Sequence, residues 1–227
     1  MIKASLDTSS SRASFALEQN GKILVEDFKD CPRGVSSLLP WIIQLVEDQK
    51  LTVNDIQQWT VGIGPGSFTG LRVGISFTKG ICYNSQAQFR GFNSGYALLQ
   101  STEKLDNYEK IAVLHDGRKE EFLVNTFEKK NGLWQNTSVE VVAIKDLDAN
   151  SFEQAITIMP ETLFEENPSV KGKTQFKTEI PAKHFFKEDT WPADLQAADD
   201  SCEPIYVRPP VFIEPQKIKD ISNLLNL

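Results

Sequence analysis

The 227-residue sequence is poor in the residues that build metal sites and disulfide frameworks. It contains two histidines, His115 and His184, and three cysteines, none of them in a C-x-x-C pair. Zinc and iron sites usually need clustered His and Cys ligands, and disulfide frameworks usually use an even number of cysteines. The sequence therefore predicts a protein of a reducing compartment, the cytoplasm, with no metal site.

The sequence also lacks a long apolar run and an excess of positive charge. No stretch of about 18 apolar residues occurs, as a membrane span would need, and the first residues lack the apolar core of a signal peptide. The formal net charge is −7, whereas a protein that binds nucleic acid by itself usually presents a basic surface. Five lysines between residues 171 and 187 are diluted by acidic residues, which favours an exposed loop. We expect no membrane association and only indirect contact with nucleic acid.

The segment 64–74, GPGSFTGLRVG, is the most informative part of the chain. It follows an apolar run at 59–63 and precedes a long apolar segment, which predicts a strand, a tight turn and a helix. Thr69 suits the N-cap of that helix. Backbone N–H groups at such a helix start can bind an anion, but the segment lacks both the P-loop lysine and G-x-G-x-x-G spacing. A structural turn is therefore favoured over a phosphate site. The predicted turn residues are Gly64, Gly66, Ser67, Thr69, Gly70 and Arg72.

This segment closely resembles the signature G-P-G-S-F-T-G-[LVI]-R-[IV]-G of the TsaB family, also called YeaZ. Members of that family are needed to make threonylcarbamoyladenosine in tRNA. Shorter resemblances are LDTS at 6–9, SLLP at 37–40, DGR at 116–118 and PIYVR at 204–208. One departure is Gly34-Val35, where the family often has His-Ser. The resemblance is close over residues 1–100 and thin over 100–200.

The resemblance implies an α/β protein of actin-like (ASKHA) architecture, with two ribonuclease-H-like domains, the second degenerate. Residue patterns fit a first domain at 1–103, with strands at 2–7, 12–18, 22–28, 58–63 and 87–92 and helices at 35–48, 70–83 and 94–103. Strands start again at 110–114, 121–127 and 139–143, followed by short runs at 155–159 and 175–177. They indicate a smaller, less regular domain at 104–227 with a Pro-rich tail.

The predicted helices 35–48 and 70–83 carry more apolar residues than one buried face needs. Either they are buried on two sides within the fold or they form a subunit interface, and the excess on both helices favours the interface. Periodicity does not decide which apolar side faces outward. The candidate contact residues are Trp41, Leu45, Leu71, Val73, Ile75, Phe77 and Ile81.

Asp7 and Thr8 follow the first predicted strand, where actin-like phosphotransferases hold magnesium and phosphate. An ordinary turn is the favoured interpretation, and these residues then form only a vestigial phosphate site. The alternative is a small-molecule kinase that uses Asp7 and the 64–70 loop around ATP phosphates. Residues 104–227 contain only three glycines, none paired, so we expect ATP or ADP only in an assembled complex.

The resemblance implies a non-catalytic relative of TsaD, the catalytic subunit of the same pathway. TsaD is recognised by H-x-x-x-H, which this sequence lacks. The implied partners are a TsaD-like catalytic subunit and a TsaE-like ATPase, with tRNA contacted only through them. In isolation we expect a homodimer with no catalytic residue and no transferase or peptidase activity.

Overall fold

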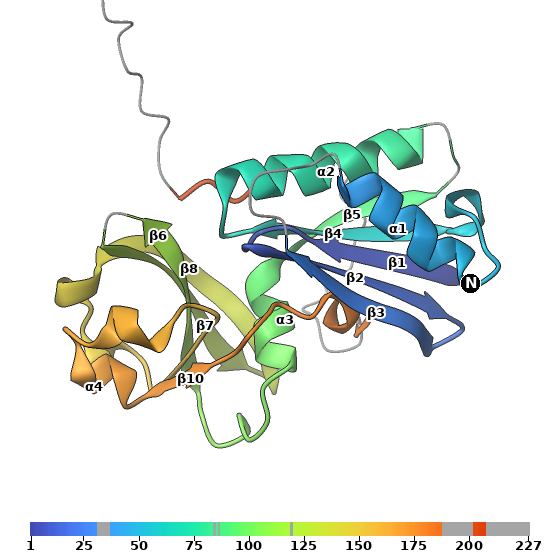
Figure 1. The fold of residues 1–227 in the computed structure, drawn as a ribbon. Helices are drawn as coiled ribbons and strands as arrows, with labels where there is room; N and C mark the ends of the chain where they lie inside the picture. Colours follow the sequence, from blue (N-terminus) through green and yellow to red (C-terminus); the bar gives the residue numbers. More distant parts are fainter. Residues whose placement is uncertain (31–36, 84, 86, 119, 188–201, 208–227) are drawn as a thin grey trace, which may run out of the picture.

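Two five-stranded mixed sheets have the same strand order (Figure 1). The computed structural model describes residues 1–30, 37–83, 85, 87–118, 120–187 and 202–207. The first sheet has the order β3-β2-β1-β4-β5 and the second β8-β7-β6-β9-β10. In each sheet the first three strands in sequence pair antiparallel, the fourth pairs in parallel with the first, and the fifth pairs in parallel with the fourth. The predicted α/β fold and its duplication are therefore confirmed.

The first sheet is formed by β1 (Ile2–Asp7), β2 (Arg12–Gln19), β3 (Lys22–Asp30), β4 (Gln58–Gly64) and β5 (Gln88–Asn93). Its helices are α1 (Leu38–Glu47), α2 (Phe68–Tyr83) and α3 (Ser94–Gln100), with a 3-10 turn η2 (Val53–Asp55). The second sheet is formed by β6 (Lys110–Arg118), β7 (Glu121–Lys130), β8 (Leu133–Ala143), β9 (Gln154–Thr157) and β10 (Thr174–Phe176). Around it lie η3 (Ile144–Asp146), η4 (Ala149–Ser151), η5 (Glu161–Phe164), α4 (Pro168–Lys171) and η6 (Ala182–Phe186).

Helices α1 and α2 cover one face of the first sheet. Strand side chains alternate between faces, so Phe15 and Leu17 point to these helices while Ala16 points away. Helix α1 contributes Leu38, Ile42 and Val46, four residues apart, to the same buried cluster. The spacing places one stripe of the helix on the sheet, as the sequence pattern predicts.

Between the two sheets lie α3 and η6 (Figure 1). Phe92 of β5, Phe127 of β7 and Phe185 of η6 belong to one buried cluster that joins both halves. The Ser5 hydroxyl donates to the Ala182 carbonyl at 2.8 Å. The chain therefore returns to the first sheet after β10. The predicted domain division at residue 103 stays a prediction.

The structure changes several predicted boundaries. The start of α1 expected at residue 35 lies outside the described residues, as does Gly34-Val35. The third helix ends at Gln100 rather than 103, and β8 begins at Leu133 rather than 139. The early part of β8 was missed because it lacks apolar alternation, and its pairing with β7 makes it a strand.

Candidate functional site

The glycine turn and the β1–β2 hairpin turn form one tightly packed joint. Ser67 donates its backbone N–H to the Ser9 carbonyl at 2.7 Å, and the Thr8 hydroxyl donates to the Gly70 carbonyl at 2.7 Å. A Cβ atom at Gly66 would overlap the Ser9 carbonyl oxygen, and one at Gly70 would overlap that of Thr8. The glycines thus allow two backbone segments to approach closely.

Ser67, rather than Thr69, caps α2. The helix begins at Phe68, so Thr69 is already inside its first turn. The Ser67 hydroxyl accepts a hydrogen bond from the Gly70 N–H at 3.3 Å, and the Ser67 carbonyl accepts from Leu71. Both residues suit an N-cap by type, so only the position of the helix start decides between them.

Asp7 lies at the end of β1 with both carboxylate oxygens occupied by hydrogen bonds. One oxygen accepts from the Ser9 N–H at 2.8 Å and the Ser9 hydroxyl at 2.6 Å; the other accepts from the Ser94 hydroxyl at 2.6 Å. Burial raises the pKa of Asp7, and the hydrogen bonds from Ser9 and Ser94 oppose that rise. The structure therefore brings Asp7, Thr8 and the glycine turn together, but as a joint held by its own hydrogen bonds.

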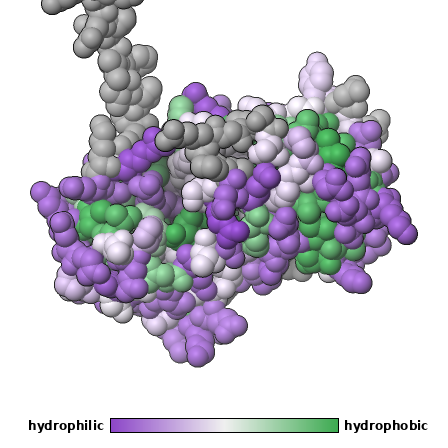
Figure 2. All heavy atoms as spheres, in the orientation of Figure 1, coloured by the Kyte–Doolittle hydropathy of each residue, from purple (hydrophilic) through white to green (hydrophobic). Residues whose placement is uncertain are grey.

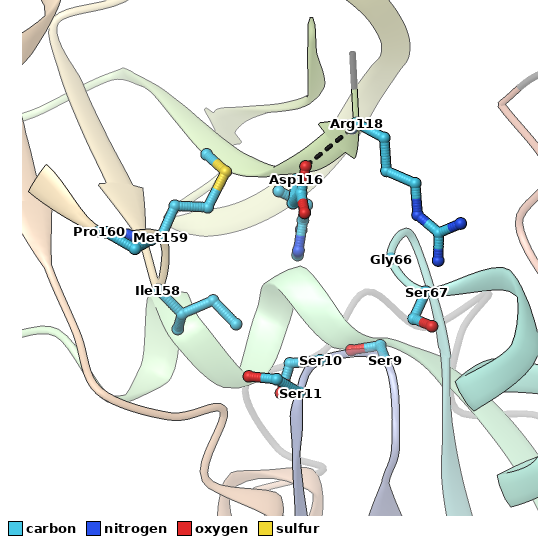
Figure 3. A pocket seen from close by; sticks show the side chains of 11 residues that line it. Ser9, Ser10, Ser11, Gly66, Ser67, Asp116, Arg118, Ile158, Met159 and Pro160 are labelled. Atoms are coloured by element: carbon cyan, nitrogen blue, oxygen red, sulfur yellow. Dashed lines mark hydrogen bonds between the residues drawn. The ribbon is translucent and has the colours of Figure 1, made fainter. Parts of the chain in front are cut away.

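A polar cleft of about 310 Å³ opens beside this joint, between the two halves (Figure 3). The first half contributes Ser9, Ser10, Ser11, Gly66 and Ser67, and the second His115, Asp116, Arg118, Ile158, Met159 and Pro160. The Asp116 carboxylate accepts from the Arg118 N–H at 2.7 Å. Serine hydroxyls and one guanidinium are suited to a polar or anionic molecule.

His115 reaches this cleft from β6 and is 3% exposed. Its Nε2 atom has no hydrogen-bond partner among the described residues. Burial lowers the pKa of His115 to about 4, so the imidazole is neutral at pH 7. His184 lies in η6, where burial and three nearby lysines lower its pKa to about 4. Neither histidine meets two further His, Cys or acidic side chains in a metal-binding group within the described parts of the chain.

The outer surface of α1 and α2 carries apolar side chains. Figure 2 shows apolar surface on the part of the first half where α1 lies. Trp41, Leu45, Val73, Phe77 and Ile81 are half-buried, packed around the helix-side core. Leu39 is 44% exposed and Phe68 49%. A groove between the helices, here the α1–α2 groove, is lined by Leu39, Phe68, Thr69, Arg72, Val73, Ser76 and Phe77.

Two of the predicted contact residues face the sheet instead. Leu71 is 1% exposed and Ile75 6%, and with Gly74 and Thr78 they form the buried stripe of α2. Packing against the sheet fills this side of the helix, so neither residue is available to a partner. Leu39 and Phe68 belong to the exposed apolar surface but were missed, because exposure at helix starts is not visible in the sequence.

Arg72 links the helix start to the end of the described chain. Its guanidinium lies over the Phe68 ring at 3.8 Å, and its Nε donates to the Tyr206 hydroxyl at 3.1 Å.

Three lysines of the basic stretch 171–187 form ion pairs or hydrogen bonds within the fold. Lys171 pairs with glutamates at 2.8 and 3.2 Å, Lys183 pairs with Glu26 at 2.7 Å, and Lys173 donates to backbone carbonyls.

The TsaD family model, described as tRNA N6-adenosine threonylcarbamoyltransferase, matches residues 34–182, about two thirds of the chain. The chain belongs to the TsaD family, in its TsaB/YeaZ branch. It is 26% identical to the Escherichia coli tRNA threonylcarbamoyladenosine biosynthesis protein TsaB over 139 residues, 60% of each chain. It is 28% identical to the Haemophilus influenzae protein of the same name over 116 residues. The match spans 60% and 49% of these two relatives.

A solved structure supports the fold of this TsaB/YeaZ-type chain over nearly its whole length. It is titled as an uncharacterized Pseudomonas aeruginosa protein with similarity to peptidase YEAZ. Its TM-score is 0.73 at 21% identity, covering 91% of this chain and 99% of the other. At this identity the likeness establishes the actin-like two-sheet fold alone. Among the described helices, none is long and apolar enough to cross a membrane.

Proposed function

We propose that the chain is a non-catalytic subunit that pairs with a TsaD-like catalytic subunit in threonylcarbamoylation of the adenosine beside the anticodon of tRNA. A TsaE-like ATPase completes the assembly, and tRNA is contacted through the partners. The observation that carries the proposal is the apolar surface of α1 and α2, with Leu39 and Phe68 about half exposed. Interfaces concentrate such apolar and aromatic anchors at their centre.

The state of Asp7 supports a non-catalytic role. A kinase of the actin-like type needs this carboxylate free for magnesium or phosphate, but Ser9 and Ser94 occupy both its oxygens. The amide of Ser67 at the start of α2 donates to Ser9 rather than facing open space. We therefore place the kinase alternative second, and we propose that ATP or ADP binds only where partner subunits complete a site.

The test is binding and reconstitution with a purified TsaD-like subunit. Leu39→Glu and Leu163→Glu form a matched pair, since both leucines are similarly exposed, 44% and 42%, and lie in different halves. We expect Leu39→Glu to weaken association at least about tenfold by placing a carboxylate in a desolvated interface, while Leu163→Glu binds as the parent. Threonylcarbamoyl transfer by the mixture should fall with Leu39→Glu alone. Equal association by both variants, or transfer by the isolated chain, would refute the proposal.

The kinase alternative is tested on the isolated chain by equilibrium binding of ATP with magnesium. We expect no saturable binding at millimolar nucleotide. Saturable binding that Asp7→Asn abolishes in a folded protein would instead support the kinase.

A further inference from the structure

The last residues that the structure describes lie at the rim of the α1–α2 groove. Residues 202–207 lie at the N-terminal end of α2 (Figure 1). Ile205 donates its N–H to the Ile63 carbonyl at 2.8 Å, and the Tyr206 ring lies 5.2 Å from that of Phe68. The Tyr206 hydroxyl also accepts from Arg72. Since Phe68 and Arg72 line the groove, the chain is anchored beside it before residue 208.

The sequence beyond this anchor contains an amphipathic pattern. Residues 208–227 lie outside the described part of the chain. Pro215 precedes a stretch in which Ile218, Ile221, Leu224 and Leu225 recur at helical spacing. Polar residues occupy the other side of a helix built on this spacing: Lys219, Asp220, Asn223 and Asn226. One narrow apolar stripe on a short helix is the form that suits an apolar groove.

The tether is long enough for this stretch to reach its own groove. The residues between Val207 and Ile218 can extend over about 35 Å, whereas the anchor contacts the groove's rim directly. A helix over 216–227 is about 18 Å long, which is shorter than the 16-residue α2. Tethering also raises the effective concentration of a short segment to about the millimolar range, so even a weak contact is formed.

We propose that residues 216–227 dock as an amphipathic helix in the α1–α2 groove of the same chain. The apolar stripe of the segment packs on Val73 and Phe77 and covers Leu39 and Phe68. The docked segment shields this surface until a partner displaces it. The docking needs only the groove and the tether, so it goes beyond the proposed function and does not depend on which partner binds.

Hydrogen–deuterium exchange of the full-length chain tests the docking through the amides of 218–225. For a contact of about 0.1 mM at millimolar effective concentration, these amides should exchange about tenfold more slowly than in an unstructured peptide. The double variant Ile221→Glu/Leu225→Glu should lose this protection. Asn223→Glu, on the polar side, should keep it. Unprotected amides in the parent, or protection that survives the double variant, would overturn the proposal.

The groove side is tested through the same amides. Leu39→Glu should release the segment, and Leu163→Glu should not; Ser76→Arg, at an exposed groove position, serves if Leu39→Glu does not fold. Protection must also be independent of protein concentration, because docking on a second copy would increase with concentration and would overturn the intramolecular form. Release of the segment by Ile221→Glu/Leu225→Glu, which leaves the groove itself unchanged, should also tighten binding of the TsaD-like subunit. If exchange responds as expected but that binding does not, the docking stands and the proposed partner surface is wrong.

Discussion

The two halves share one strand order but differ in what covers their sheets. The first sheet is packed by α1 and the 16-residue α2, whose outer sides carry exposed or half-buried apolar side chains among polar ones. The outer face of the second is closed by short 3-10 turns and the four-residue α4, with Phe122 stacked on Phe164 at 4.9 Å. A sheet topology therefore does not determine function. Within the described residues, the helices that carry the proposed partner surface occur in the first half alone.

The two halves also differ in the surroundings of an aspartate near the end of the first strand of each sheet. Asp7 ends β1 and Asp116 lies near the end of β6, the corresponding first strands of the two sheets. Asp7 is fully buried under hydrogen bonds from the hairpin turn and α3. Asp116 is exposed to the cleft, where it accepts from the Arg118 N–H. The first half uses its carboxylate to fix a joint, whereas the second leaves the equivalent group at the surface.

The largest expected effect is the difference in stability between glutamate substitutions on the two sides of α2. Ile75→Glu would bury an unpaired carboxylate against the first sheet and should cost at least about 4 kcal/mol of unfolding free energy. Val73→Glu lies on the half-exposed side and should cost less than about 1.5 kcal/mol, yet abolish association. Circular dichroism melts and sedimentation velocity measure the two effects. If the Val73→Glu variant associates like the parent, the half-exposed side of α2 is not a binding surface, and α2 gives the first half no binding role that the second lacks.

The sequence predicted the two long helices, and the strands apart from the early part of β8, because their apolar periods are regular. It did not predict which side of α2 faces the sheet, since residues 71–82 are apolar or small nearly all round the helix. Leu71 and Ile75 are buried because the turn at Gly66 and Gly70 fixes the rotation of the helix on β4. The placement of Ala182–Phe186 under the first sheet was equally invisible, because it depends on contacts between distant segments.

Of the candidate site, the sequence predicted the glycine turn and its neighbourhood with Asp7 and Thr8. It did not predict that the Ser94 hydroxyl donates to the Asp7 carboxylate, because that hydrogen bond joins residues 87 positions apart. Likewise, the cleft is formed by the approach of the two halves, and nothing local in the sequence marks His115 as one of its lining residues.

The second largest effect tests the joint of the first half. Gly66→Ala places a methyl group on the Ser9 carbonyl oxygen, so the turn or the hairpin must move. We expect a loss of about 3 kcal/mol in unfolding free energy from this overpacking. Partner binding should weaken in parallel, because α2 is displaced. Chemical denaturation and a binding titration provide the two values. Loss of binding at unchanged stability would make the turn a direct contact instead of a packing joint.

A third prediction uses the buried histidine of the second half. The pKa of His115 is about 4 in the folded chain against an ordinary value of 6.5. Between these values the unfolded chain binds the proton and the folded chain does not, so stability falls as pH falls. At pH 5 the loss relative to pH 7 should be about 2 kcal/mol. His115→Leu should remove that part of the pH dependence.

Asp7, the buried acid of the first half, contributes a pH dependence of stability with the opposite sign. The raised pKa of Asp7 means that its folded form holds a proton more readily, so its contribution to stability increases as pH falls. For this reason the measurement is the difference between parent and His115→Leu in urea unfolding at pH 7, 6 and 5. Parallel pH curves for the two proteins would show that His115 titrates alike in the folded and unfolded chains, which contradicts its burial.

The smallest effects come from one chemical change made in each half. Gly80 in α2 and Gly132 between β7 and β8 both have open space where a Cβ atom would lie. They differ in backbone conformation, because Gly132 has a φ of +79° and Gly80 is helical. Gly80→Ala should stabilise the chain by about 0.5–1 kcal/mol through helix propensity and a less flexible unfolded state. Gly132→Ala should destabilise it by about 1 kcal/mol, because alanine is strained at positive φ. Denaturation at low protein concentration keeps association from contributing, and equal signs for the two variants would show that side-chain contacts at one of these positions outweigh its backbone.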